Sequence, residues 1–230
     1  MQVAILAGGL ATRLGDLTRN QPKSLVKVWG EPFLEYQLEL LKGGGIKDIV
    51  LCISHLGEQI ERHFGNGREY GVNIKYSVED KLLGTAGALK RAEALLNDIF
   101  FTMYGDSYLF LDFPVAMHYF KSQNKLALMT VYKNYDQYDR SNTVVEGNLV
   151  KKFSKKERTE DIVYIEYGAN IFKKEALKMI PENQFYSLDE LFPRLIEMEE
   201  LLAFEVKERF YEIGSPQGLK EFGEYIKGVK

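Results

Sequence analysis

The chain has 230 residues, of which 45% are hydrophobic and 27% are charged, and its formal net charge is −3. This length and composition suit a globular α/β protein with a sizeable core. The slight acidic excess argues against a general nucleic-acid binder, so any anionic ligand must be held by local groups. Cys52 is the only cysteine, which excludes disulfides within the chain and cysteine-based metal sites.

Neither a targeting segment nor a membrane span stands out. Met1 leads directly into a strand pattern, without the charged and apolar regions of a signal peptide. No apolar run approaches the ~20 residues that cross a bilayer. We therefore expect a cytoplasmic protein that binds neither membrane nor nucleic acid.

Apolar, β-rich runs alternate with helical periodicity in the first half of the chain, a pattern typical of a mostly parallel sheet covered by helices. Strands are predicted at residues 1–6, 48–54, 72–78, 99–105 and 126–132. Helices are predicted at residues 33–41, around Ile60 and Phe64, at 85–96 and at 113–123.

The second half has a different pattern. Residues 142–154 predict a hairpin that turns at Gly147-Asn148, a pair suited to positive φ. Further strands are predicted at 161–172, 201–207 and 209–214, with a helix at 188–200 capped by Ser187 and another after Pro216. With neither a linker nor an internal repeat, the pattern favours one domain.

The stretch "LAGGLATRLGDLTRNQPKSLVKV" follows the first predicted strand. The backbone of Gly8 and Gly9 can approach a polyphosphate closely, because glycine has no Cβ. Arg13 offers a planar fork of donors to phosphate oxygens, and Lys23 offers a compact second charge. The alternative is a surface loop with two solvated cations, but all four residues at this spacing favour phosphate binding.

A second motif, "YGDSYL", places Asp106 at the carboxyl end of the fourth predicted strand. Ligand sites gather at this edge of open α/β sheets. A carboxylate there suits Mg²⁺, which is held by one or two carboxylates together with substrate phosphates. The alternative is a simple turn aspartate in a Gly-Asp-Ser corner.

These motifs resemble the sugar-1-phosphate nucleotidyltransferases, also called nucleoside-diphosphate-sugar pyrophosphorylases. The resemblance is carried by "ILAGGLATRL", "QPKSLVKV", "GEPFLEYQLELL", "SVEDKLLGTAGALKRA", "YGDSYL", "YIEYGANIF" and "FYEIGSPQGL". It covers essentially the whole chain. It is nearest to short members of the heptose-1-phosphate guanylyltransferase and N-acetylmuramate-1-phosphate uridylyltransferase types.

The resemblance implies a Rossmann-like, three-layer α/β/α sandwich with a mixed, mostly parallel central sheet. It implies a single domain over residues 1–230, with a nucleotide-binding half at 1–110 and a sugar-phosphate-binding half at 111–230. The implied reaction is Mg²⁺-dependent: a sugar-1-phosphate attacks the α-phosphorus of an NTP and pyrophosphate leaves. Its product would be a precursor of cell-surface polysaccharide, and the family leaves room for a homo-oligomer.

The resemblance also implies which residues bind the nucleotide. Arg13 would stabilise the leaving pyrophosphate, and Lys23 the attacked or the attacking phosphate. The other expected nucleotide contacts are Leu6, Ala7, Gly8, Gly9, Glu79, Gly84 and Thr85. "LLGTAGAL" alone favours an ordinary helix start capped by Thr85. Within the whole pattern of the resemblance, Gly84 and Gly87 are expected to leave room for a flat base.

For the metal, the resemblance implies Asp106 together with a second carboxylate from a late strand. "YEIGSP" places Glu212 where family members usually have Asp, so either the metal position shifts or a water intervenes. A strand-end surface glutamate is the alternative interpretation.

Sugar recognition is expected near Glu166, Gly168 and Asn170 in "YIEYGANIF". Many relatives carry Glu-Lys-Pro after the preceding hairpin, whereas "FSKKE" offers Lys155 and Lys156 here. Lys156 aligns with the family lysine and is the expected ligand of the sugar phosphate, with a solvated lysine pair as the alternative.

Two other functions fit a chain of this pattern. A nucleotide-sugar-dependent glycosyltransferase of similar fold would need an Asp-x-Asp metal motif, which "GDS" does not supply. A non-catalytic, nucleotide-binding regulatory homologue would show substitutions such as Glu212, although Arg13, Lys23 and Asp106 are all present.

Overall fold

The computed structural model describes residues 1–9 and 12–229. Its strands are β1 (Gln2–Leu6), β2 (Lys27–Val28), β3 (Glu31–Pro32), β4 (Asp48–Ile53), β5 (Asn73–Val78), β6 (Ile99–Tyr104), β7 (Ser107–Tyr108), β8 (Ala127–Lys133), β9 (Thr143–Glu146), β10 (Leu149–Phe153), β11 (Tyr164–Lys173), β12 (Leu201–Val206) and β13 (Tyr211–Glu212). Its α-helices are α1 (Phe33–Gly43), α2 (Gly57–Phe64), α3 (Gly84–Arg91), α4 (Phe113–Ser122), α5 (Leu188–Glu197) and α6 (Pro216–Val229). Its 3-10 helices are η1 (Thr12–Thr18), η2 (Lys23–Leu25), η3 (Arg68–Tyr70), η4 (Glu93–Leu95) and η5 (Lys174–Met179).

The main sheet of the described residues has nine strands in the order β5-β4-β1-β6-β11-β8-β12-β10-β9. The first four of these are parallel. β11 is antiparallel to both of its neighbours, β6 and β8, and β10 is antiparallel to β12 and β9. β12 is again parallel to β8. The sheet is therefore mixed, as expected, with parallel pairs among the first four strands and between β8 and β12. Strand direction depends on how the chain crosses between strands, which a hydrophobic pattern does not record.

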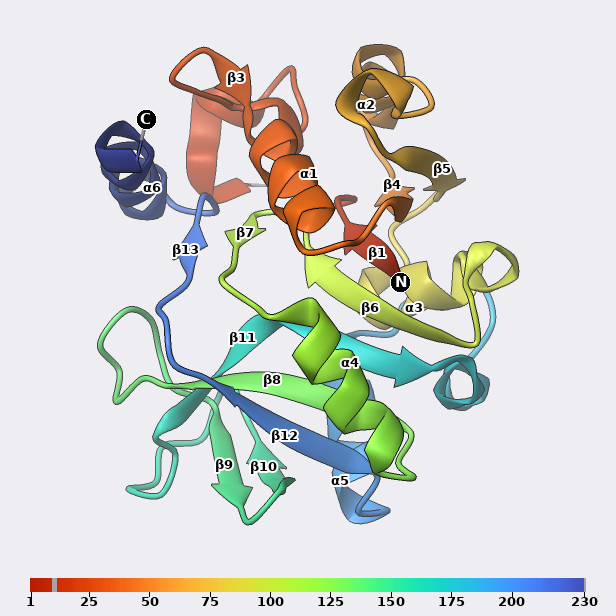
Figure 1. The fold of residues 1–230 in the computed structure, drawn as a ribbon, viewed down its shortest axis with the longest axis vertical. Helices are drawn as coiled ribbons and strands as arrows, with labels where there is room; N and C mark the ends of the chain where they lie inside the picture. The colour runs from red at the N-terminus through yellow and green to blue at the C-terminus, as the bar shows by residue number, and fades with distance from the viewer. Residues whose placement is uncertain (10–11, 230) are drawn as a thin grey trace.

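Side chains from successive residues of β1 enter opposite faces of the sheet. Val3 and Ile5 pack in a cluster with side chains of α1, α2 and α4. Ala4 packs on the other face with side chains of α3 and α5. Helices therefore cover both faces of the sheet, with α1 and α4 in front of it in Figure 1 and α5 behind. This period of two is the pattern expected of a strand buried on both sides.

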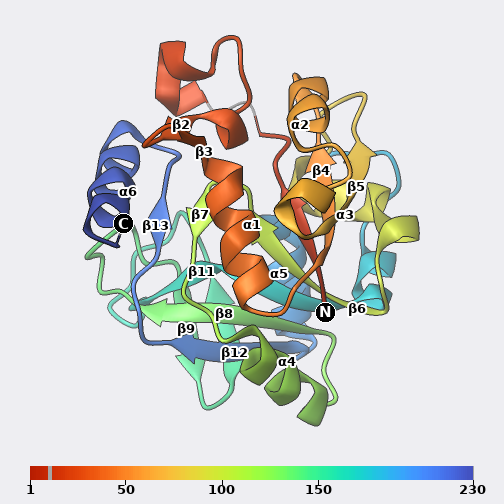
Figure 2. The same cartoon turned by 45° about the horizontal axis from the view of Figure 1, so that its top comes forward.

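A third cluster joins the end of the chain to its beginning. Phe222 of α6 makes edge-to-face contacts with Phe33 and Tyr36 of α1, at ring-centroid distances of 5.1 and 5.5 Å. Figure 2 shows α6 beside the small β2–β3 hairpin. β13, just before α6, pairs with β7 in a separate two-stranded sheet. This packing brings the late strand next to the corner that follows β6.

Most predicted elements are confirmed, including the hairpin, where Gly147 has a φ of +60°. Three boundaries differ: the helix predicted at 85–96 ends at Arg91, the helix predicted at 188–200 ends at Glu197, and the strand predicted at 161–172 begins at Tyr164. A fourth difference is at β13, which spans only Tyr211–Glu212 of the strand predicted at 209–214. β2, β3 and β7 escaped sequence prediction, because two-residue strands are too short to show a period. None of the helices in the described part of the chain is long and apolar enough to cross a membrane.

Candidate active site

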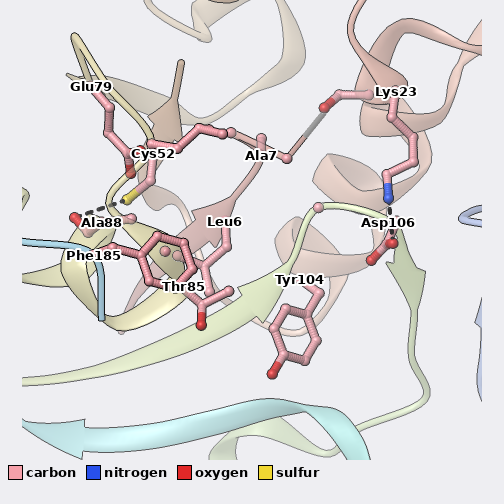
Figure 3. Close-up of a pocket in the computed structure, with 16 residues that line it drawn as sticks. Leu6, Ala7, Lys23, Cys52, Glu79, Thr85, Ala88, Tyr104, Asp106 and Phe185 are labelled. Atoms are coloured by element: carbon pink, nitrogen blue, oxygen red, sulfur yellow. Dashed lines mark hydrogen bonds and ion pairs between the residues drawn. The ribbon is translucent and has the colours of Figure 1, made fainter. Parts of the chain in front are cut away.

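A cavity of about 460 Å³ lies at the carboxyl ends of β1, β4 and β6 (Figure 3). This is the edge of a parallel sheet where ligand sites usually form. Residues predicted from distant parts of the sequence line it together: Leu6, Ala7, Gly8, Gly9, Lys23, Glu79, Gly84, Thr85 and Asp106.

The first wall of the cavity is the loop after β1. Its start is fixed by the Ala7 amide, which donates to the Cys52 carbonyl, and by the Ser54 hydroxyl, which donates to the Gly8 carbonyl at 2.5 Å. A Cβ at position 8 would lie 3.2 Å from the Ser54 oxygen, whereas one at position 9 would meet nothing within 4 Å. The next two residues of the predicted loop, Leu10 and Ala11, lie outside the described residues.

Lys23 and Asp106 form an ion pair at one end of the cavity. The Lys23 ammonium donates to Asp106 Oδ2 at 2.5 Å, and both side chains are about four-fifths buried. Figure 3 shows the two side chains pointing toward each other from η2 and from the corner after β6. Burial lowers the local dielectric, so each of these charges depends on the other.

Glu212 lies beside Asp106 because of the β7–β13 pairing. Glu212 is the register partner of Ser107, and the Ile213 amide donates to the Asp106 carbonyl at 2.9 Å. A Cβ placed on Gly214 would lie 2.7 Å from Glu212 Oε2, 2.8 Å from Arg13 Nη2 and 3.0 Å from Asp106 Oδ2. The structure thus brings the predicted Arg13, Asp106 and Glu212 to one point, although Arg13 and Glu212 do not line the cavity itself.

The Glu212 carboxylate also supports the turn that follows it. One oxygen accepts a hydrogen bond from the Gly214 amide, and the other accepts one from the Ser215 hydroxyl at 2.5 Å. A Cβ at Gly218 would overlap the same carboxylate, so glycine there leaves room for the longer side chain. Glu212 therefore combines a position beside Asp106 with a structural role.

The predicted sugar-binding residues lie on β11, behind the cavity wall. Asn170 Nδ2 donates to Glu166 Oε1 at 2.9 Å, and Glu166 also hydrogen-bonds the side chain of Tyr104, which lines the cavity. Burial raises the pKa of the Glu166 carboxyl. Gly168, with a φ of +107°, lies in the β-bulge between Glu166 and Asn170, against Ser107. These residues are gathered next to the cavity, but they do not line it.

Lys155 and Lys156 have different surroundings. The Lys155 ammonium lies 2.9 Å from Asp189 Oδ1 on α5. Burial raises the pKa of Glu166, and the Lys155 charge offsets part of that rise. Lys156 is exposed, and its backbone amide donates to the Ser154 hydroxyl. The structure therefore brings Lys155, and not the predicted Lys156, toward the sugar-binding residues.

The glycines of "LLGTAGAL" lie against a chain segment that crosses them. A Cβ at Gly84, whose φ is +74°, would lie 2.7 Å from the Tyr186 carbonyl oxygen, and one at Gly87 would lie 3.0 Å from the Gln184 carbonyl oxygen. The amide of Gly87 donates to the Tyr186 carbonyl, and the Thr85 hydroxyl accepts from the Leu188 amide at 2.8 Å. These glycines therefore have a structural reason as well, and because Gly84 and Thr85 line the cavity, the expected contact with a base stays a prediction.

Several residues of the cavity were not predicted from the sequence: Ser24, Cys52, Leu82, Ala88, Tyr104, Gly105 and Phe185. Tyr104 and Gly105 adjoin the "GDS" motif and could have been found as its neighbours. Phe185, which is 65% exposed, is carried to the cavity by the loop before α5, and no local pattern marks it. Burial, and then the nearby Glu79 carboxylate, raises the pKa of the Cys52 thiol to about 12, so this cysteine is not a nucleophile.

Among the described residues, no group of three or more His, Cys, Asp or Glu side chains could hold a metal ion on its own. Asp106 and Glu212 are a pair. Any divalent cation they hold must complete its coordination with ligand oxygens or water, as Mg²⁺ commonly does at phosphate sites.

A mixed α/β sheet with cations and carboxylates at the mouth of a largely apolar cavity has the chemistry of a protein that binds phosphorylated ligands. The chain matches the nucleotidyl transferase family over residues 2–227 and belongs to that family.

Two curated relatives illustrate the range of the family. The chain is 31% identical over 215 residues to a UTP–glucose-1-phosphate uridylyltransferase of Synechocystis, covering 86% of this chain and 55% of the relative. It is 29% identical to the D-glycero-alpha-D-manno-heptose 1-phosphate guanylyltransferase of Campylobacter jejuni, covering 96% of this chain and 98% of the relative. The chain thus spans about half the length of some curated relatives and nearly all of another.

A solved structure resembles the whole chain. HddC from Yersinia pseudotuberculosis, crystallised in complex with GMP-PN, superposes with a TM-score of 0.83 at 26% identity. The match covers 98% of this chain and 99% of the HddC chain.

Proposed function

We propose that this protein transfers a nucleotidyl group from an NTP to a sugar-1-phosphate, releasing pyrophosphate. The observation that carries the proposal is the convergence of Arg13, Lys23, Asp106 and Glu212 beside the glycine loop. Nucleotidyl transfer requires little covalent chemistry from the protein and depends on positioning and on neutralising phosphate charge. Two cations and two carboxylates at one end of an apolar cavity are suited to both tasks.

The residues at this end of the cavity fit a magnesium ion. Gly214 leaves a space that a Cβ would fill, and the oxygens of Glu212 and Asp106 face it. Mg²⁺ bound by these carboxylates would neutralise charge on the substrate phosphates. Lys23 shares the Asp106 oxygen that a cation would use, so it would then turn to the phosphates, while Arg13 grips the leaving pyrophosphate.

We further propose that the nucleobase is guanine, because of the chemistry of Glu79. Its side chain is buried, and Oε2 accepts a hydrogen bond from the Leu83 amide at 3.1 Å. Among the described residues the carboxylate has no ion-pair partner, and burial raises its pKa. Guanine presents two donors side by side on one edge, N1–H and N2–H₂, whereas uracil places its N3–H between two oxygens that a carboxylate repels.

Uridylyl transfer is the second candidate, favoured by the protonated form of the same side chain. A neutral Glu79 carboxyl offers one donor and one acceptor, which match O4 and N3–H of uracil. Burial raises the pKa of the Glu79 carboxyl and thereby favours that form. With either base, the sugar-1-phosphate would lie against Tyr104, on the side of the cavity next to Glu166. The product would serve cell-surface polysaccharide synthesis.

The decisive experiment measures pyrophosphate release from a matrix of NTPs and sugar-1-phosphates. We expect release with GTP and at least one sugar-1-phosphate, in the presence of Mg²⁺. ITP lacks the N2 amino group, so it should be about tenfold less effective, the scale of one hydrogen bond to a charged group. No turnover in this matrix, together with release of nucleoside diphosphate from an added nucleotide-sugar, would instead indicate a glycosyltransferase, and nucleotide binding without either reaction would indicate a regulatory protein.

The variant Glu79→Gln tests the choice of base. An amide offers one acceptor and one donor, so the preference for GTP over UTP should fall or reverse. Glu93→Gln is the matched control, because Glu93 pairs with Lys90 and does not line the cavity. An unchanged GTP-to-UTP ratio in Glu79→Gln would contradict the assignment of the base while leaving the transferase proposal intact.

A further inference from the structure

Gln37 is a polar side chain that the proposed reaction does not account for. It lies on α1, on the side that faces the sheet, and is fully buried. Its Nε2 donates two hydrogen bonds, one to the Tyr104 carbonyl at 2.9 Å and one to the Ser107 carbonyl at 2.7 Å. These two carbonyls lie on either side of Gly105 and Asp106.

The other end of the Gln37 amide is unsatisfied. Oε1 is buried and has no hydrogen-bond partner. An unpaired buried acceptor is unfavourable, and a methionine of similar shape would avoid that cost. The reverse amide orientation would place Oε1 against two carbonyl oxygens, so the two donated bonds fix the orientation. What an amide gains here must therefore come from those two bonds.

The two bonds hold the backbone corner of residues 104–107. The corner is restrained from its other side as well, because a Cβ at Gly105 would lie 2.9 Å from the Leu6 carbonyl oxygen and 3.1 Å from the Ala7 Cα. Ser107 also pairs with Glu212 through β7–β13. Residues 104–107 are thus in contact with α1, with the end of β1 and with β13.

We propose that Gln37 is a positioning residue that aims the Asp106 carboxylate at Lys23 and at the cation position beside Glu212. This inference rests on the proposed metal role of Asp106. Residues that orient a metal ligand without touching the metal typically change its affinity by about 10- to 100-fold when they are replaced. A purely structural Gln37 would change the stability of the fold alone.

The test uses Mn²⁺ alone as the probe, because it takes the same oxygen ligands as Mg²⁺ and is visible by electron paramagnetic resonance. We expect Gln37→Met to raise the Mn²⁺ dissociation constant at least about tenfold and to raise the Mg²⁺ concentration for half-maximal activity likewise. The KM for the sugar-1-phosphate should be unchanged. Leu41→Val is the matched control: Leu41 is a fully buried neighbour on α1.

Gln37→Glu gives a graded second variant if Gln37→Met does not fold. A buried carboxyl is held protonated and keeps one of the two donated bonds, so its Mn²⁺ affinity should be intermediate. Wild-type Mn²⁺ affinity in either variant, with melting temperatures lowered as in Leu41→Val, would overturn the proposal. So would a wild-type protein that binds no Mn²⁺. If the Mn²⁺ affinities shift but no NTP releases pyrophosphate, the proposed function fails and the positioning role stands.

Discussion

At the scale of single residues, Arg13 is an exposed cation that we propose binds the substrate. It is exposed on η1, and its guanidinium points toward Gly214 between two carboxylates. An exposed arginine held near carboxylates contributes little to folding. We therefore propose that it binds a substrate anion.

We expect Arg13→Ala to lower kcat/KM by about 10²–10³-fold, the scale of removing one preorganised donor to a developing charge. The free energy of unfolding should hardly change. Arg19→Ala is the matched control, because Arg19 lies just after the same helix and pairs with Asp16 at the surface. Steady-state kinetics and urea unfolding of both variants decide the matter, and near-normal kcat/KM in Arg13→Ala would remove Arg13 from the site.

Glu212 has two roles that mutation can separate. Glu212→Gln removes the ligand charge and one of the hydrogen bonds to the following turn. Ser215→Ala removes the hydrogen bond that its hydroxyl donates to Glu212 and the one that it accepts from the Gly218 amide, but it leaves the Glu212 charge in place. We expect Glu212→Gln to weaken the apparent Mg²⁺ affinity about tenfold, and Ser215→Ala to leave it near the wild-type value. If both variants lose only stability, by similar amounts, Glu212 is a turn residue.

At the scale of elements, the start of α3 depends on the segment before α5. Gly84 combines a positive φ with the Tyr186 carbonyl at close approach. Alanine there must displace that segment, which carries Phe185 at the mouth of the cavity. The same contact therefore links helix stability to nucleotide binding.

We expect Gly84→Ala to lower the free energy of unfolding by about 1–3 kcal/mol and to weaken nucleotide binding. Gly43→Ala is the control, because a Cβ there meets nothing within 4 Å and alanine favours the last turn of α1. Urea titrations together with nucleotide titrations measure both effects. Equal stability of the two variants would show that the segment before α5 adapts without cost.

At the scale of the whole molecule, buried acids connect stability to pH. Burial raises the folded-state pKa of Glu79 and Glu166 above the ordinary glutamate value. The folded protein then binds more protons than the unfolded chain between the two pKa values. These groups therefore favour folding at low pH, and that contribution is lost as pH rises from the ordinary pKa of about 4.3 to the raised one.

Glu166→Gln cannot titrate at this position, so it should lose less stability than wild type as pH rises above the ordinary glutamate pKa. We therefore predict that the melting temperature of Glu166→Gln minus that of wild type increases with pH between the ordinary and the raised pKa. Glu199→Gln is the control with the opposite sign, because Lys151 lowers the pKa of Glu199. Melting curves between about pH 4 and pH 8 measure both. A Glu166→Gln difference that does not change with pH would contradict the raised pKa.

Local sequence patterns predicted most of the element types and the candidate phosphate-binding residues. Gly8, Gly9, Arg13, Lys23 and Asp106 belong to short motifs at strand ends, and parallel strands align their carboxyl ends at one edge. Local patterns therefore sufficed to place these residues in one site. The hairpin at Gly147 and the helix capped by Ser187 are local in the same way, since turn and capping chemistry act within a few residues.

Only the tertiary structure decided which distant residues meet. The direction of β11, the pairing of Glu212 with Ser107 and the choice of Lys155 over Lys156 all depend on how chain segments cross. Gly84 is glycine because Tyr186 crosses it, a contact 102 residues away in the chain that no local pattern carries. Gln37 lies on a helix whose sequence shows only its amphipathic period, and its partners are two backbone carbonyls. Backbone groups exist at every residue, so which of them a buried side chain meets is fixed by packing and not by the sequence pattern.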